Sequence, residues 1–337
     1  MNPGDFSVAA TESSHVAAAR SAAQRLAQGF EFDATRAGRV AIVVTEAVTN
    51  MLKHAGGGTL AVRTLAWGGA IGIEVLAIDS GPGMPDFAGS ARDGTSTTGT
   101  PGTGLGAMRR LSDEFEAWSY PGQGTILRMV LWDRKAPTTR PTHQVGAVCI
   151  PKPGESVCGD AWDVVFHSRG ATFLVADGLG HGPDASRAAI AAVEVLQGHP
   201  DDSVVRILDL AHGRLRPTRG AAVAVMRHDL AAGEVSYAGV GNISATILGS
   251  PRRSMVSHAG IVGHNVHKAQ EYRYAWTYDA LMVAHSDGLE TQWDLGPYPG
   301  IAECHAALIA AMLYREHARG RDDCTVLVAR PLREGTR

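Results

Sequence analysis

The stretch IDSGPGMPD, residues 78–86, decides how the first half of this chain is interpreted. An apolar run ends in Asp79, and a glycine-rich turn then closes on Pro-Asp. A second stretch, VADGLGHGPD at residues 175–184, has the same arrangement around Asp177. An aspartate that ends a strand and enters glycines can contact a base, a phosphate or a metal ion, so the surrounding sequence must separate these possibilities.

The chain is long enough for two ordinary domains. It has 337 residues with 45% hydrophobic content, so each half can bury its own core. The net charge of −3, from 31 basic and 34 acidic residues without long runs, predicts neither a nucleic-acid-binding nor a membrane-binding surface. The four cysteines form no C-x-x-C pair, and the sequence has neither a signal peptide nor a long apolar segment, which predicts a cytoplasmic protein with reduced thiols.

A linker divides the two halves. The stretch DRKAPTTRPTH, residues 133–143, combines prolines, threonines and basic residues without periodicity, as is typical of exposed connections. We predict one domain at residues 1–134, a linker at 135–143 and a second domain at 144–337. The order of expected helices and strands differs between the halves, so the two similar stretches do not mark a duplicated domain. The oligomeric state cannot be predicted from this sequence.

The segment RVAIVVTEAVTNMLKHA, residues 39–55, predicts a core-facing helix because its apolar residues recur at i, i+3, i+4 and i+7. Glu46, Asn50 and Lys53 share the opposite face. Alone, such a stripe is typical of a solvated surface. Two strand-like runs, the turn at 79–86, a second glycine turn in GTPGTGLGAMRRL (residues 99–111) and GQGTILRMVLW (residues 122–132) follow it, and this order favours a functional site.

The order of these motifs resembles the GHKL ATP-binding fold, an α/β sandwich with helices on one face of a mixed sheet. Asp79 can accept a hydrogen bond from the amino group of adenine, and Thr125 can complete that pocket. Gly81 and Gly83 let the backbone approach the purine. The second glycine turn can direct backbone N–H groups and a helix N-terminus at the phosphates. Its candidate nucleotide-binding residues are Gly102, Thr103, Gly104, Leu105 and Gly106.

Glu46 and Asn50 have chemical roles that fit this fold. The amide oxygen of Asn50 is a suitable ligand for Mg²⁺. Glu46, one turn earlier, is placed to take a proton from an attacking hydroxyl or to order the water that does so. The stretch DGTSTTGTPGTGLGAMRRLSDEFE, residues 93–116, is similar to the RsbT-type serine kinases of bacterial stress-response switches, and this likeness covers about residues 8–132. It implies ATP and Mg²⁺ as cofactors and a serine on a STAS-domain antagonist or stressosome-type scaffold protein as substrate.

Aspartates carry the signal in the second half. Asp160, Asp177 and Asp287 lie where strand-like runs meet turns, and Asp322 and Asp323 lie just before such a run. Singly, each is typical of an Asx turn or a helix cap. Together they favour a pair of divalent ions, Mg²⁺ or Mn²⁺, which can hold a hydroxide for in-line attack on phosphorus.

The series GESVCGD, VADGLGHG, TRGAAVAVM, VGNI, SDGL and RDDCTVLVA resembles the metal-dependent type 2C serine/threonine phosphatases, within the SpoIIE-like branch and its RsbX type, over about residues 144–332. This resemblance implies an α-β-β-α sandwich in which Asp177 bridges two metals and serves catalysis. Gly159 departs from the pattern, because the family often has an acid there. Asp323 would support its neighbour Asp322, and the sequence leaves the opposite choice between these two neighbours open. The implied metal ligands are Asp160, Asp177, the carbonyl of Gly178, Asp287 and Asp322.

The two resemblances predict an α+β switch protein that phosphorylates and dephosphorylates STAS-domain regulators in a partner-switching pathway. Two alternatives remain open for the ATP-binding half. It can be a non-catalytic regulator of the phosphatase, or a module that binds a sigma factor or another partner. The presence of both Glu46 and Asn50 favours the kinase.

Overall fold

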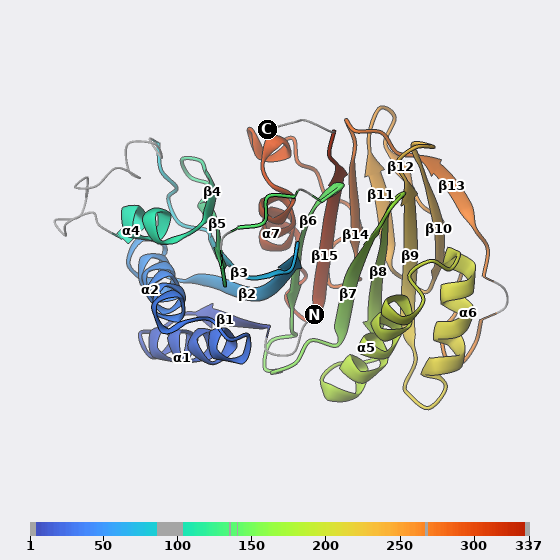
Figure 1. Ribbon diagram of the computed structural model, residues 1–337, viewed down its shortest axis with the longest axis horizontal. Coiled ribbons are helices and arrows are strands. Elements are labelled where there is room, and N and C mark those ends of the chain that lie inside the picture. The colour runs from blue at the N-terminus through green and yellow to red at the C-terminus, as the bar shows by residue number, and fades with distance from the viewer. Residues whose placement is uncertain (1–4, 86–103, 135, 140, 267–268, 334–337) are drawn as a thin grey trace. The chain divides into compact units, whose positions relative to one another are not determined.

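The computed structural model describes residues 5–85, 104–134, 136–139, 141–266 and 269–333. It forms two compact units (Figure 1). The N-terminal unit comprises Asn2–Arg140 and Asp294–Arg315, and the C-terminal unit comprises Pro141–Trp293 and Glu316–Arg337. Residues 294–315 therefore group with the N-terminal unit, whereas the position of the linker motif places them in the second domain. The domain bounds given by that motif stay a prediction.

A five-stranded sheet with the order β1-β2-β3-β5-β4 forms the frame of the N-terminal unit. All its pairings are antiparallel, which corrects the mixed sheet that the resemblance implied. The short turns between β2 and β3 and between β4 and β5 explain the difference, because a tight turn can join only antiparallel strands. The strands are β1 (Phe6–Ala10), β2 (Gly58–Trp67), β3 (Ala70–Asp79), β4 (Glu114–Ser119) and β5 (Thr125–Trp132).

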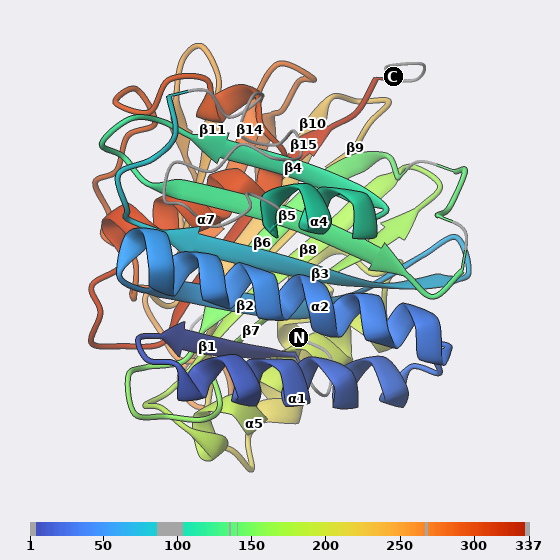
Figure 2. The ribbon, with the colours of Figure 1, turned by 90° about the vertical axis from the view of Figure 1, so that its left-hand side faces the viewer.

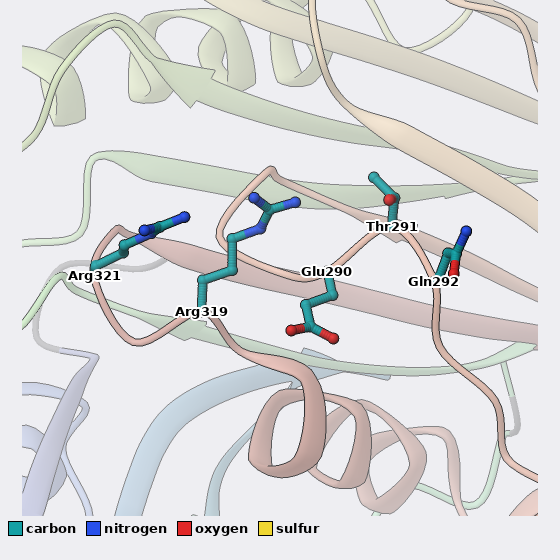
Figure 3. Close-up of a pocket in the computed structure, with 5 residues that line it drawn as sticks. All are labelled: Glu290, Thr291, Gln292, Arg319 and Arg321. Atoms are coloured by element: carbon teal, nitrogen blue, oxygen red, sulfur yellow. The ribbon is translucent and has the colours of Figure 1, made fainter.

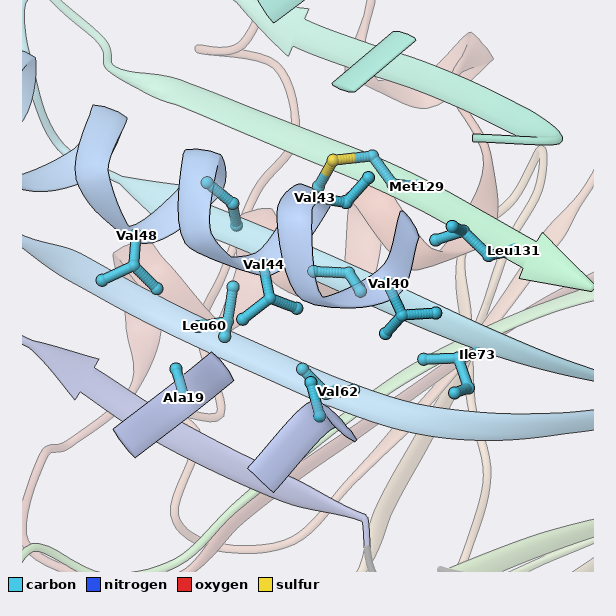
Figure 4. Close-up of a cluster of buried hydrophobic side chains, with 14 of the residues drawn as sticks. Ala19, Val40, Val43, Val44, Val48, Leu60, Val62, Ile73, Met129 and Leu131 are labelled. Atoms are coloured by element: carbon cyan, nitrogen blue, oxygen red, sulfur yellow. The ribbon is translucent and has the colours of Figure 1, made fainter. Parts of the chain in front are cut away.

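Helices cover one face of this sheet (Figure 2). They are α1 (Ser14–Gly29), α2 (Ala34–Asn50) with a π-helical turn at Met51–Ala55, and α4 (Gly104–Leu111). The predicted apolar stripe of α2 is confirmed, since Val40, Val44 and Val48 are fully buried and pack with Leu60 and Val62 of β2 (Figure 4). Burying this stripe leaves the other face of α2 for polar side chains.

The C-terminal unit is a sandwich of two five-stranded sheets, ordered β13-β10-β9-β8-β7 and β12-β11-β14-β15-β6. Phe173, Tyr237 and Met282 belong to the core between the two sheets. The strands are β6 (His143–Ile150), β7 (Asp160–His167), β8 (Gly170–Gly178), β9 (Ala221–Asp229), β10 (Glu234–Val240), β11 (Ser244–Leu248), β12 (Arg253–Ser254), β13 (Tyr272–Ala275), β14 (Leu281–His285) and β15 (Cys324–Pro331).

Helices α5 (Pro183–Gly198) and α6 (Val204–Leu215) pack on the outer face of the first of these sheets. A 3₁₀ turn at Ile301–Glu303 precedes α7 (Ala306–His317), which lies mostly in the segment that groups with the N-terminal unit. Within the described ranges, none of the helices has the length and apolar character needed to cross a lipid bilayer.

Candidate nucleotide site and candidate metal centre

The end of α2 and the start of α4 form the first part of the candidate nucleotide site. Helix α4 begins at Gly104, directly against the side chains of Glu46 and Asn50. A Cβ atom at Gly104 would lie 2.7 Å from Glu46 Oε2 and 3.3 Å from Asn50 Oδ1. The structure therefore brings Glu46 and Asn50 to the N-terminus of α4, where free N–H groups and the helix dipole favour an anion.

Asp79 ends β3 and is held in place by backbone donors. Its Oδ1 accepts hydrogen bonds from Gly81 N at 2.9 Å and from Thr125 N at 3.1 Å. Thr125 lies opposite Asp79 in the pairing of β3 with β5, and its hydroxyl is 2.9 Å from Ser119 Oγ. Burial raises the pKa of Asp79, although these hydrogen bonds oppose the shift. Among the described residues nothing donates to Oδ2, so this oxygen can accept a hydrogen bond from a ligand.

The glycines near Asp79 also have a reason within the protein itself. A Cβ atom at Gly83, where φ is 66°, would collide with the carbonyl of Tyr120, and one at Gly81 would lie 2.7 Å from Ala55 Cβ. Local packing therefore requires these glycines, and their contact with a purine stays a prediction. Gly102 and Thr103 lie outside the described residues, whereas Gly104, Leu105 and Gly106 form the first turn of α4.

Arg315 contacts this site, although it was not among the residues predicted from the sequence. Its Nη1 donates to the backbone oxygen of Asp79 at 2.8 Å, and its guanidinium lies 5.6 Å from the centre of the Trp118 ring. Asp79 and Arg315 are 236 positions apart in the sequence, and Arg315 belongs to no motif. An arginine in the last turn of an apolar helix is an ordinary feature, so no signal in the sequence singled it out.

In the C-terminal unit, the predicted aspartates lie at the ends of four strands. Asp160 and Asp177 face each other in the pairing of β7 with β8. Asp287 follows β14, and Asp322 precedes β15, which pairs with β14. Burial raises the pKa of Asp177 well above its usual range, and the charges of the other carboxylates raise it further. The pairing of β7 with β8 and that of β14 with β15 place these carboxylates in two pairs at strand ends.

Hydrogen bonds orient several of these carboxylates. Ser286 donates its hydroxyl to Asp160 Oδ2 at 2.6 Å and accepts from Thr325 N at 2.9 Å. Asn242 Nδ2 donates to Asp287 Oδ2 at 2.7 Å. Ser286 and Asn242 were not among the predicted site residues, although they lie in the stretches SDGL and VGNI. A hydroxyl or amide has a partner only once the fold has placed one nearby, so the motif alone did not reveal their roles.

Asp322 and Asp323 have different surroundings. Asp322 is exposed, and its Oδ1 accepts from Asp323 N at 3.0 Å. Asp323 is buried, and its Oδ1 accepts from Lys152 N at 2.9 Å. A Cβ atom at Gly159 would lie 2.5 Å from Asp323 Oδ2, so no larger side chain fits there without a shift. This contact gives a physical reason for the departure at Gly159.

The donor atoms fit hard divalent cations. Asp160 Oδ1 and Asp323 Oδ2 are buried without a hydrogen-bond partner in the described part of the chain, and a cation would relieve the repulsion among these carboxylates. Across the described residues, no three His, Cys, Asp or Glu side chains are arranged to hold an ion by themselves. Water would therefore complete the coordination, as Mg²⁺ commonly requires. The assignment of individual ligands stays a prediction.

Residues 8–131 match the family described as the histidine kinase-like ATPase domain. The serine/threonine-protein kinase RsbT of Bacillus subtilis (strain 168) is 34% identical to this chain over 119 residues, which cover 35% of this chain and 90% of RsbT. The chain therefore belongs to the RsbT family of serine/threonine-protein kinases through its N-terminal unit. This confirms the first resemblance.

The chain is also similar to the phosphoserine phosphatase RsbX of the same bacterium, with 28% identity over 143 residues, 42% of this chain and 71% of RsbX. A crystal structure of RsbX in complex with magnesium matches with a TM-score of 0.50 and 19% identity, covering 58% of this chain and 98% of that one, which shows a shared fold. A chain solved in a study of the bacterial stressosome matches with a TM-score of 0.53 and 32% identity, covering 56% of this chain and 99% of that one. The predicted combination is therefore found as family membership for the N-terminal unit and as similarity to RsbX for the rest of the chain.

Proposed function

We propose that this chain carries two opposed activities of a bacterial stress-signalling pathway. The N-terminal unit transfers a phosphoryl group from ATP to a serine, and the C-terminal unit removes it in a metal-dependent reaction. The substrates are STAS-domain regulators or stressosome-type scaffold proteins, and the protein works in the cytoplasm. The observation that carries this proposal is the presence in one chain of an acid-amide pair against a helix N-terminus and of clustered aspartates at four strand ends.

In the proposed kinase site, each side chain has a separate task. Asp79 accepts a hydrogen bond from the adenine amino group, and the start of α4 faces the phosphates. Asn50 would be a ligand of the Mg²⁺ that accompanies ATP. Glu46 accepts the proton of the attacking serine hydroxyl. The contact of Gly104 with Glu46 and Asn50 supports this arrangement, because it keeps both side chains next to the phosphate-binding turn.

In the proposed phosphatase site, the protein supplies a rigid set of oxygen atoms. Asp160, Asp177, the carbonyl of Gly178, Asp287 and Asp322 would hold two divalent ions, Mg²⁺ or Mn²⁺. When bound, such ions supply a hydroxide that attacks phosphorus in line with the leaving serine oxygen. Ser286 fixes the orientation of Asp160, and Asn242 fixes that of Asp287. These hydrogen bonds support the site because orientation of the ligands tunes metal affinity.

The two sites can be tested separately in the full chain. Asp79→Asn is expected to lower the affinity for ATP at least about 10-fold by isothermal titration, because an amide nitrogen replaces an acceptor oxygen. Asp177→Asn is expected to abolish Mn²⁺-dependent release of phosphate from a phosphoserine protein. Asp209→Asn, which changes an exposed aspartate of α6, is the control for both. If Asp79→Asn leaves the ATP affinity unchanged, the role of Asp79 in ATP binding is contradicted. If Asp177→Asn leaves phosphate release unchanged, the role of Asp177 in the phosphatase site is contradicted.

A second candidate function makes ATP a regulator of the phosphatase. The hydrogen bond from Arg315 to the backbone of Asp79 favours it, because Arg315 lies on the stretch of chain between Asp287 and Asp322. Nucleotide binding at Asp79 would then act on a segment whose two ends continue into the candidate metal centre. Phosphatase rates measured with and without a non-hydrolysable ATP analogue test this role. Equal rates, in a protein that binds the analogue, would exclude it.

A further inference from the structure

A polar pocket of about 430 Å³ lies in the C-terminal unit (Figure 3). Its lining comes from two short segments, one that follows Asp287 and one that precedes Asp322. None of the predicted metal ligands lines it, so the pocket is separate from the candidate metal centre. The residues that line it are Glu290, Thr291, Gln292, Arg319 and Arg321.

Backbone hydrogen bonds join the two walls of this pocket. Glu290 N donates to His317 O at 2.9 Å, and Arg319 N donates to Gly288 O at 2.8 Å. Leu289 and Ala318 form an antiparallel bridge between the same segments. The pocket is therefore formed by two paired segments and not by independent loops, and Arg321 is the direct neighbour of Asp322 in the chain.

The two arginines give the pocket a positive charge. Arg319 and Arg321 are both exposed, and neither guanidinium makes a hydrogen bond or ion pair with the residues that the structure describes. The one acidic residue of the lining, Glu290, has its Oε2 3.8 Å from His317 Nδ1. The backbone of Arg319 is bonded to Gly288, the direct neighbour of Asp287, so Arg319 lies close to the candidate metal centre.

We propose that this pocket binds an acidic side chain of the protein substrate close to its phosphoserine. This inference rests on the proposed phosphatase function. A guanidinium group can donate two parallel hydrogen bonds to the two oxygens of a planar carboxylate, and the pocket has two such groups. Thr291 and Gln292 offer neutral hydrogen-bonding groups to the adjacent peptide. The volume is within the range of pockets that bind small ligands. The phosphoryl group itself would bind to the ions that the aspartates would hold, and these aspartates contribute nothing to the pocket lining.

The test compares phosphoserine peptides that differ only in their flanking residues. Two glutamates are placed before or after the phosphoserine, and the reference peptide has alanines at those positions. For the natural chain with Mn²⁺, kcat/KM for the better glutamate peptide is expected to exceed that of the alanine peptide about 10-fold. In the double variant Arg319→Ala and Arg321→Ala this ratio should fall to about one. Arg319→Glu with Arg321→Glu should instead favour peptides with flanking lysines.

The control variant is Arg169→Ala. Arg169 is an exposed arginine in the β7–β8 turn, at the opposite end of this hairpin from the paired Asp160 and Asp177. The Arg169→Ala variant should keep the kcat/KM ratio between the glutamate and alanine peptides that the natural chain shows. A kcat/KM ratio of one between the glutamate and alanine peptides in the natural chain would overturn the inference. It would also be overturned if the alanine double variant lowered kcat/KM for both peptides and for p-nitrophenyl phosphate by the same factor. If the natural chain hydrolyses neither the peptides nor p-nitrophenyl phosphate with Mn²⁺, the phosphatase proposal itself is wrong, together with this inference.

Discussion

Glu74 is a fully buried carboxylate held between two arginines of neighbouring strands. Arg63 Nε lies 2.5 Å from its Oε2, and Arg128 Nε lies 2.7 Å from its Oε1. Burial raises the pKa of Glu74, but the two guanidinium groups outweigh it and lower the pKa to about 2. A neutral residue at this position would take away the counterion that both guanidinium groups share and leave Arg128 with only its ion pair to Glu114. Removing one partner of a buried ion pair is costly.

Glu74→Gln is therefore expected to lower the free energy of unfolding by about 3 kcal/mol. Because the folded pKa lies below the ordinary value of 4.5, the stabilisation by Glu74 is complete above that pH and is lost as the pH falls towards 2. Scanning calorimetry of the full chain at pH 7 measures the effect. Glu12→Gln, at an exposed glutamate beside His15, is the control and should leave the transition unchanged. Equal behaviour of the two variants would contradict this account.

His143 and His228 form a buried pair inside the C-terminal unit, with His143 Nε2 2.7 Å from His228 Nδ1. His228 Nε2 lies 3.1 Å from the carbonyl of Trp276, so this nitrogen must carry the proton. His228 Nδ1 then accepts from His143 Nε2, and His143 Nδ1 accepts from the hydroxyl of Thr142 at 3.0 Å. The chain of hydrogen bonds is thus complete when both rings are neutral.

Burial lowers the pKa of His143 to about 3 and that of His228 to about 4. Since both values lie below the ordinary 6.5, the stability that depends on neutral rings is complete above pH 6.5 and is lost as the pH falls towards 3. We expect the melting temperature to fall over this range, and His143→Gln, which cannot titrate, to weaken that dependence. Ring nitrogen NMR shifts of a neutral imidazole at pH 5 would support the assignment. An ordinary titration near pH 6.5 would contradict it.

At the scale of single elements, α2 shows which features a sequence can predict. Its apolar residues repeat with the helical period, so the buried face, and the shared polar face of Glu46 and Asn50, followed from the sequence alone. The approach of Gly104 to both side chains followed only from the order of motifs. The hydrogen bond from Arg315 and the partners of Glu74 did not follow, because they depend on strand register and on segments far apart in the chain.

Helix α2 begins at a capping residue, Asp33, whose Oδ1 accepts from Arg36 N at 2.8 Å. Asp33→Ala removes this cap and is expected to cost about 1 kcal/mol of stability. Because α2 carries Glu46 and Asn50, the variant should also weaken ATP binding, as measured by isothermal titration. Ser203→Ala, which removes the cap of α6, is the matched control. It should destabilise the C-terminal unit and leave ATP affinity unchanged. Equal ATP affinity in both variants would contradict a role for α2 in the nucleotide site.

For the whole molecule, the sequence predicted both families and the presence of two sites. It placed the boundary near residues 135–143, but it gave no sign that residues 294–315 group with the N-terminal unit. Linkers are recognised by composition, whereas grouping depends on which surfaces a segment packs against, and local patterns do not encode this. The similar stretches around Asp79 and Asp177 show the same limit, because their different partners come from distant parts of the chain.

The central claim is that the two units act in opposite directions on one serine. The most direct measurement is the phosphorylation state, by intact-protein mass spectrometry, of purified STAS-domain proteins from the organism that encodes this chain, incubated with ATP, Mg²⁺ and Mn²⁺. With Asp177→Asn, one of these proteins should accumulate a single phosphoserine. With Glu46→Gln, the same phosphoserine, installed beforehand, should disappear. The claim would be contradicted if Asp177→Asn phosphorylated none of these proteins, or if the two variants acted on different serines.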